Sequence, residues 1–82
     1  MPHYYLHIRS KNGLSKDLQG EDLPNIETAQ AAAVRVIRRI RASKLWSQLL
    51  PEAQRQMAIE VTDETGRTVL IIPFCGGKVQ PP

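Results

Sequence analysis

The chain has 82 residues, a net charge of +3, one cysteine and only 5% aromatic residues. A domain of this length buries about 60–65% of the surface that its unfolded chain exposes, which favours a two-layer fold over a three-layer fold or a deep substrate cavity. No segment approaches the roughly 20 apolar residues that cross a bilayer, and the N-terminus lacks the pattern of a signal peptide. With a single cysteine and no disulfide, we expect a cytoplasmic protein.

The N-terminal segment predicts a β-hairpin. Apolar and polar residues alternate from His3 to Ser10, and this period of two is typical of a half-buried strand. Asn12-Gly13 then predicts a type I′ turn, because both central positions of that turn need positive φ. We expect a short, polar return strand near Leu14 to Leu18, as suits the edge of a sheet.

An amphipathic helix over residues 26–42 is the strongest pattern in the sequence. Asn25 is placed to cap its N-terminus, and at ~100° per residue one face collects the side chains expected to pack on the sheet. These are Ala29, Ala33, Val36, Ile37 and Ile40. Ser43 is expected to cap a second, short helix that contains Trp46 and ends at Pro51.

A second hairpin follows the helices. Apolar residues alternate from Met57 to Thr62, and Gly66 in the loop that follows is available for a left-handed conformation. The segment from Thr68 to Phe74 is apolar at nearly every position, which predicts an interior strand covered on both faces.

The predicted fold class is α+β. The order ββα(α)ββ favours a two-layer sandwich, with a four-stranded, mainly antiparallel sheet packed on one long and one short helix. We expect a single domain over residues 1–75 and a flexible C-terminal tail over residues 76–82.

The two ends of the predicted domain carry recognisable motifs. They are Pro2-His3-Tyr4-Tyr5-Leu6-His7-Ile8-Arg9 and Glu60-Val61-Thr62-Asp63-Glu64-Thr65-Gly66-Arg67 with Pro73-Phe74. Together with Asp22-Leu23-Pro24 before the helix, they resemble a family of small proteobacterial proteins of unknown function. This resemblance spans residues 2–74 and implies a domain without an assigned activity.

A second resemblance covers residues 4–42. Paired strands, a Leu-Pro loop and an alanine-rich helix are similar to HicB-type antitoxins. Those proteins have an additional strand and usually a DNA-binding segment, and this sequence lacks both, so the similarity is an analogy of fold.

Reactive side chains are few and poorly placed for chemistry. His3 and His7 share a strand face but stand ~13 Å apart, too far for two ligands of one zinc ion. Cys75 has no predicted helix N-terminus or oriented base beside it, so an activated thiolate is not expected. We predict that the protein is not an enzyme and needs no metal or cofactor.

The face of the sheet turned away from the helices is the leading candidate for function. If one helical layer covers only one face, apolar residues on the other remain exposed, and such a patch commonly marks an interface. The expected interface residues are Tyr5, His7, Val69 and Ile71. We predict an interaction or regulatory module that forms a homodimer or binds a protein partner through this face.

Nucleic-acid binding is the alternative. Between Thr28 and Pro51 the sequence has five cations and no Asp or Glu: Arg35, Arg38, Arg39, Arg41 and Lys44. Four or five phosphate contacts would give a slope of about −4 for log affinity against log salt on duplex DNA. The same cations are also suited to a solvated face, or to pairing with acidic residues of a neighbouring subunit, namely Asp17, Glu21, Asp22 or Glu27.

Overall fold

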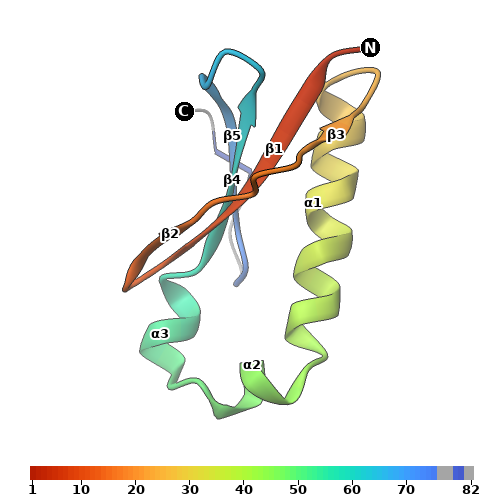
Figure 1. Cartoon of the computed structure of the whole chain (residues 1–82). Coiled ribbons are helices and arrows are strands. Elements are labelled where there is room, and N and C mark those ends of the chain that lie inside the picture. The colour runs from red at the N-terminus through yellow and green to blue at the C-terminus, as the bar shows by residue number, and fades with distance from the viewer. Residues whose placement is uncertain (76–78, 81–82) are drawn as a thin grey trace.

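A computed structural model of the chain describes residues 1–75, 79 and 80 (Figure 1). Within this part of the chain the elements are β1 (His3–Ser10), β2 (Gly13–Ser15), β3 (Glu21–Asp22), α1 (Ile26–Arg41), α2 (Lys44–Gln48), α3 (Pro51–Arg55), β4 (Ala58–Asp63) and β5 (Thr68–Pro73). All strand pairs are antiparallel in the order β2-β1-β4-β5, and β3 also pairs with β1. The predicted α+β class is confirmed, with one more strand and one more helix than expected.

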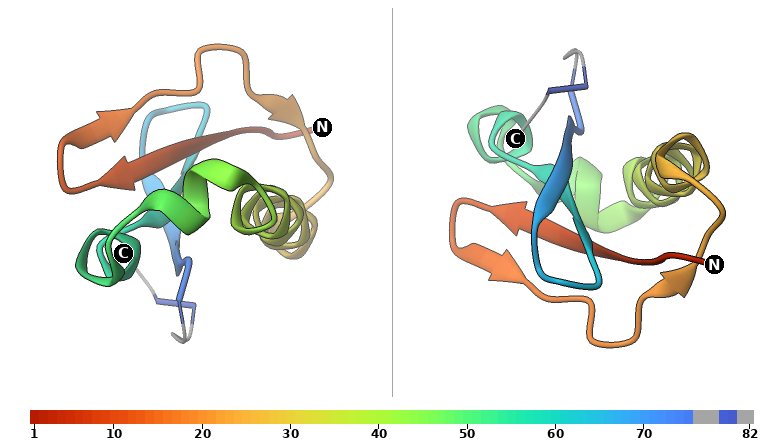
Figure 2. Two further views of the ribbon diagram at one scale, coloured as in Figure 1. Left: turned by 90° about the horizontal axis from the view of Figure 1, so that it is seen from below. Right: turned by 90° about the horizontal axis from the view of Figure 1, so that it is seen from above.

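The long helix α1 packs against β4 and β5. Asn25 caps it, since its Oδ1 accepts the backbone N–H of Thr28 at 2.8 Å. Ala29 and Ala33 are fully buried, and their small side chains let the helix approach the sheet closely. The predicted apolar face is confirmed, and Ala32 is buried with it. On the opposite side of β1 from α1 runs the β2–β3 segment (Figure 2).

The short helices close one end of the core. Ser43 caps α2 as predicted, with its Oγ 3.4 Å from the N–H of Trp46. The Trp46 ring stacks on Phe74, 5.5 Å between centroids, so α2 covers the end of the sheet. Pro51 was expected to end the helical region, but it begins α3 instead. Proline suits the first position of a helix, where the N–H that it lacks would have no intrahelical partner.

The predicted type I′ turn after β1 is wrong. Ser10 pairs with Gly13, so the two turn residues are Lys11 and Asn12. No residue other than glycine has positive φ in the described residues, whereas a type I′ turn needs it at both positions. Gly13 supplies the positive φ after the turn, at +122°, and the return strand is shorter than expected.

The predicted interior position of β5 is also wrong. Among the described residues, β4 alone pairs with β5 along its length, and on the other side a single bridge joins Ile71 to Gln80. The register between β4 and β5 shifts at Val61 and Thr62, which leaves Val69 packed against the core. Of the predicted flexible tail, residues 76–78 and 81–82 lie outside the described residues.

Candidate functional site

The open face of the sheet is polar and internally hydrogen-bonded. Arg9 on β1 donates to the Glu60 carboxylate on β4 at 2.6 Å, and the same carboxylate accepts the Thr68 hydroxyl at 2.7 Å. Tyr5 stacks on His7, with ring centroids 6.1 Å apart. These cross-strand bonds satisfy polar groups of the face within the chain, and the exposed side chains of Leu14 and Leu18 lie at the depression beside them.

The structure divides the four predicted interface residues between two environments. Tyr5 and His7 are on the open face, where they line a shallow depression. Ile71 is half-buried opposite Glu60 in register, and its backbone bonds to Gln80. Val69 does not share this face, because the register shift turns it toward the core. Sequence alternation could not reveal the extra residue that causes the shift.

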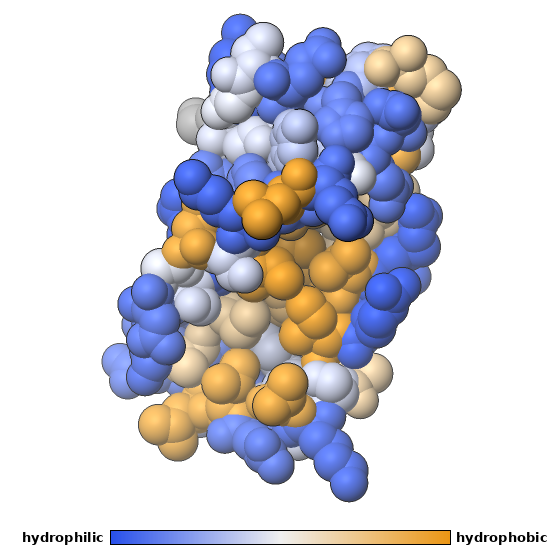
Figure 3. Space-filling view, in the orientation of Figure 1, coloured by the Kyte–Doolittle hydropathy of each residue, from blue (hydrophilic) through white to orange (hydrophobic). Residues whose placement is uncertain are grey.

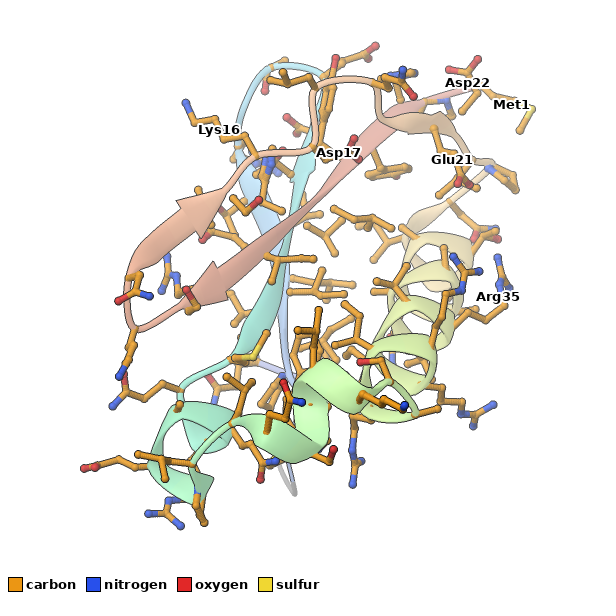
Figure 4. All side chains as sticks on the ribbon, turned by 60° about the horizontal axis from the view of Figure 1, so that its bottom comes forward. Met1, Lys16, Asp17, Glu21, Asp22 and Arg35 are labelled. Carbon is orange, nitrogen blue, oxygen red and sulfur yellow. The ribbon has the colours of Figure 1, made fainter. Side chains whose placement is uncertain are left out.

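A loop over residues 16–20, called the strap below, fills the gap between β2 and β3 along the edge of β1. Asp17 holds it: one carboxylate oxygen accepts the N–H of Leu6 at 3.1 Å, and the other accepts those of Gln19 and Gly20 at 3.2 and 3.1 Å. Figure 4 shows Asp17 over β1. The carboxylate thus replaces the missing strand partner of Leu6.

Two histidines fasten the strap to the sheet. His7 Nδ1 accepts the Asp17 N–H at 3.0 Å, so the ring proton is on Nε2, which faces Thr62 Oγ1 at 3.0 Å. His3 Nδ1 is 2.6 Å from the Asp22 carboxylate, and its Nε2 is 2.8 Å from the Gln19 carbonyl. Both partners of His3 are acceptors, so both ring nitrogens donate and the imidazolium form is favoured.

We expect the pKa of His3 to lie above its usual 6.5, because the hydrogen bond to Asp22 and then that to the Gln19 carbonyl favour the charged ring. The contribution of this contact to stability is therefore complete below pH 6.5 and is lost as pH rises through the folded-state value. An NMR titration of the His3 ring protons measures this pKa. Asp22→Asn should lower the His3 pKa, and a wild-type value at or below 6.5 would contradict the contact.

We expect Gly20→Ala to destabilise the fold more than Gly66→Ala. Both glycines have positive φ, +66° and +88°, so each substitution carries a conformational cost of about 1–2 kcal/mol. A Cβ on Gly20 would also lie 2.5 Å from His3 Nε2 and 2.7 Å from the Tyr4 carbonyl oxygen, whereas nothing lies within 4 Å at Gly66. Urea denaturation of the two variants measures the difference, and equal losses would contradict the tight fit of the strap.

An apolar groove lies at the other end of the molecule, between the β1–β2 turn and the three helices. Its volume is about 550 Å³, within the range of roughly 300–1,000 Å³ that ligand pockets have. The apolar side chains that line it are Ile40, Leu45, Trp46, Leu49, Ala53 and Met57. In Figure 3 hydrophobic residues fill the central hollow and continue along the lower end, over α2 and α3.

Leucines that line or adjoin the groove are open to solvent. Leu45 is 74% exposed, Leu50 is 70% exposed, and Leu49 is 37% exposed. Sequence reasoning placed this segment over the sheet and missed the groove. The signal was present, since Leu49 and Leu50 directly follow Leu45 and Trp46 of α2, which is more apolar side chains than one buried face of so short a helix can use.

The groove has a positive rim. Lys11 comes from the β1–β2 turn and Arg39 from the last turns of α1, and none of the described residues that line the groove is Asp or Glu. Arg41 stands beside the groove, with its Cζ 6.0 Å from the centre of the Trp46 ring. A ligand in the groove would therefore meet apolar walls and unopposed positive charge.

The five predicted nucleic-acid-binding cations do not form one surface. Arg35 and Arg38 line a shallow depression with Glu27 on the outer side of α1, where Figure 4 shows Arg35. Arg39 faces the groove, and Arg41 lies near Trp46. Among the described residues, none of the five forms an ion pair.

No group of three or more His, Cys, Asp or Glu side chains is placed to hold a metal ion in the described part of the chain. The Cys75 thiol donates weakly to the Gln54 carbonyl at 3.7 Å. No described helix is long and apolar enough to span a membrane.

The fold and these surfaces define a small α+β domain with an open antiparallel sheet. Over residues 3–75 the sequence matches the model of the family described as Domain of unknown function (DUF6894), and the chain belongs to that family. The predicted membership of a family of small domains of unknown function is thus confirmed, and the proteobacterial distribution stays a prediction. The end motifs and the similarity to HicB-type antitoxins stay predictions. Neither the curated proteins nor the solved structures gave a match.

Proposed function

We propose that this domain is a noncatalytic protein-interaction module whose partner binds in the apolar groove beside α2 and α3. The observation that carries the proposal is the exposure of Leu45 and Leu50 next to a groove lined by Trp46. Exposed apolar side chains that adjoin a concave surface are typical of protein interfaces. The hydrogen-bonded sheet face supports self-association less well, so homodimerisation through Tyr5, His7, Val69 and Ile71 stays a prediction.

The test is selection of binders from a displayed library of random peptides, using the full chain as bait. We expect Leu45→Gln to weaken the selected binders about tenfold, because truncating one apolar anchor of an interface costs more than 1 kcal/mol. Leu18→Gln is the matched control, since Leu18 is 85% exposed and does not line the groove. If no peptide binds, or if the two variants weaken binding equally, the proposed function is wrong.

Nucleic-acid binding is the second candidate, favoured by the absence of ion pairs on the helix cations among the described residues. This candidate is weaker because the cations are divided between surfaces. Arg35 and Arg38 share theirs with the acidic side chain of Glu27. We expect any affinity for a fluorescent duplex to fall with salt with a slope of about −2, as two phosphate contacts predict. Fluorescence anisotropy at two salt concentrations measures the slope, and Arg35→Gln should reduce it.

A further inference from the structure

We propose that the partner in the groove is an amphipathic helix of another protein, with acidic residues beside its apolar anchors. This inference rests on the proposed function and names the chemistry of the partner. A helix presents side chains at i, i+3, i+4 and i+7 on one face, and grooves between helices commonly accept such a face. The groove lies between the C-terminal end of α1 and the short helices α2 and α3, so side chains of a docked helix can enter it from the solvent.

An added strand fits this surface poorly. Strand addition depends on free N–H and C=O groups along the edge of a sheet. Among the described residues that line the groove, the sheet contributes only Ser10 at the end of β1; Lys11 and Asn12 belong to the β1–β2 turn, and Met57 comes just before β4. No strand edge therefore borders the apolar floor, and side-chain insertion is the mode of binding that the groove supports.

The rim specifies the charge of the partner. Lys11 and Arg39 stand on different sides of the groove, and no acidic side chain among the described lining residues opposes them. An Asp or Glu on either flank of a docked helix would meet a cation, and Lys or Arg there would be repelled. Two further cations, Arg41 at the end of α1 and Lys44 at the start of α2, add positive charge to this end of the molecule.

A second copy of this chain is disfavoured as the occupant. A symmetric dimer uses the same patch on both subunits, so the two grooves would bring Lys11 and Arg39 toward the same cations of the partner. The chain carries a net charge of +3, which adds to the repulsion. Charge complementarity therefore assigns the groove to a different, acidic chain.

The experiment uses three synthetic helical peptides of about 16 residues, long enough to be helical in part. All three carry Leu at i, i+3, i+4 and i+7, and their flanking positions are Glu, Gln or Lys. Trp46 is the single tryptophan of the chain and lines the groove, so its fluorescence reports binding directly. We expect the Glu peptide to bind about tenfold tighter than the Lys peptide, with Gln between them, and the preference to shrink at high salt.

Two double variants test the origin of this preference. Lys11→Gln with Arg39→Gln removes the rim charges and should abolish it. Lys16→Gln with Arg35→Gln removes one lysine and one arginine that do not line the groove, and should leave it intact. All four side chains are exposed, so neither pair is expected to unfold the protein.

The outcomes separate the inference from the proposed function. If groove-dependent peptides bind equally well with Glu, Gln or Lys flanks, or best with Lys, the acidic partner is wrong and the interaction module stands. If the preference survives in the Lys11 and Arg39 variant, the rim is not its source and the inference fails. If neither the three peptides nor the displayed library gives binders sensitive to Leu45→Gln, both are wrong. A dimer with Trp46 at its interface in sedimentation and quenching experiments would also overturn the inference.

Discussion

Phe74→Ala is expected to reduce the free energy of unfolding by about 3–5 kcal/mol. The Phe74 side chain is 2% exposed and is among the largest fully buried groups of the core. Phe74 also positions two residues that line the groove, since its ring stacks on Trp46 and its N–H donates to the Met57 carbonyl at 3.0 Å. A chain of this length is stable by only about 4–12 kcal/mol, so the substitution removes a large share of the total stability.

Urea denaturation followed by circular dichroism measures the loss. Phe74→Leu is the control, because it keeps an apolar side chain and should cost less than half as much as the alanine variant. We also expect Trp46 emission of the alanine variant to shift to longer wavelength, as the ring that covers one side of the indole is removed. A loss below about 1 kcal/mol would contradict a core built around the Trp46–Phe74 pair.

Asp17→Ala is expected to cost about 1–3 kcal/mol, because it leaves the N–H groups of Leu6, Gln19 and Gly20 without their shared acceptor. Asp17→Asn should recover part of this loss. An amide has one oxygen where the carboxylate has two, so its NH₂ group would face either Leu6 or the pair of strap donors. Urea denaturation at neutral pH ranks the three proteins, and equal stability of all three would contradict the role of the strap.

The effect of Asp17 depends on pH in a defined direction. Burial alone would raise the pKa of Asp17, but the backbone donors Gly20, Leu6 and Gln19 outweigh it and lower the pKa below the usual 3.8. The carboxylate therefore contributes its full stabilisation above pH 3.8, and the contribution is lost as pH falls through the folded-state value. The gap in stability between wild type and Asp17→Asn should narrow in acid, and a constant gap would contradict this assignment.

Much of the fold could be predicted because it depends on short-range rules. The 3.6-residue period of α1, the caps at Asn25 and Ser43, and the left-handed Gly66 each depend on residues within about four positions along the chain. The alternation in β1 and β4 likewise located two strands and the faces of their side chains. These local patterns were sufficient to give the two-layer α+β arrangement.

The features that failed prediction depend on which segments meet. The edge position of β5 follows from the order of the strands, in which β4 is its neighbour on one side, and the displacement of Val69 follows from the register shift between β4 and β5. Asp17 gains its role only when the strap lies along β1, because its acceptor oxygens serve the N–H of Leu6, eleven residues away.

The candidate site illustrates the same limit. The sequence by itself determined that this chain has an arginine-rich amphipathic helix, a short leucine-rich helix with Trp46, and two hairpins. Only the tertiary structure decided that Lys11, Arg39 and Met57 surround Trp46 in one groove. The physical reason is that no short stretch of sequence encodes the groove. Its lining comes from the β1–β2 turn, the three helices and Met57, and packing of the whole core sets their relative positions.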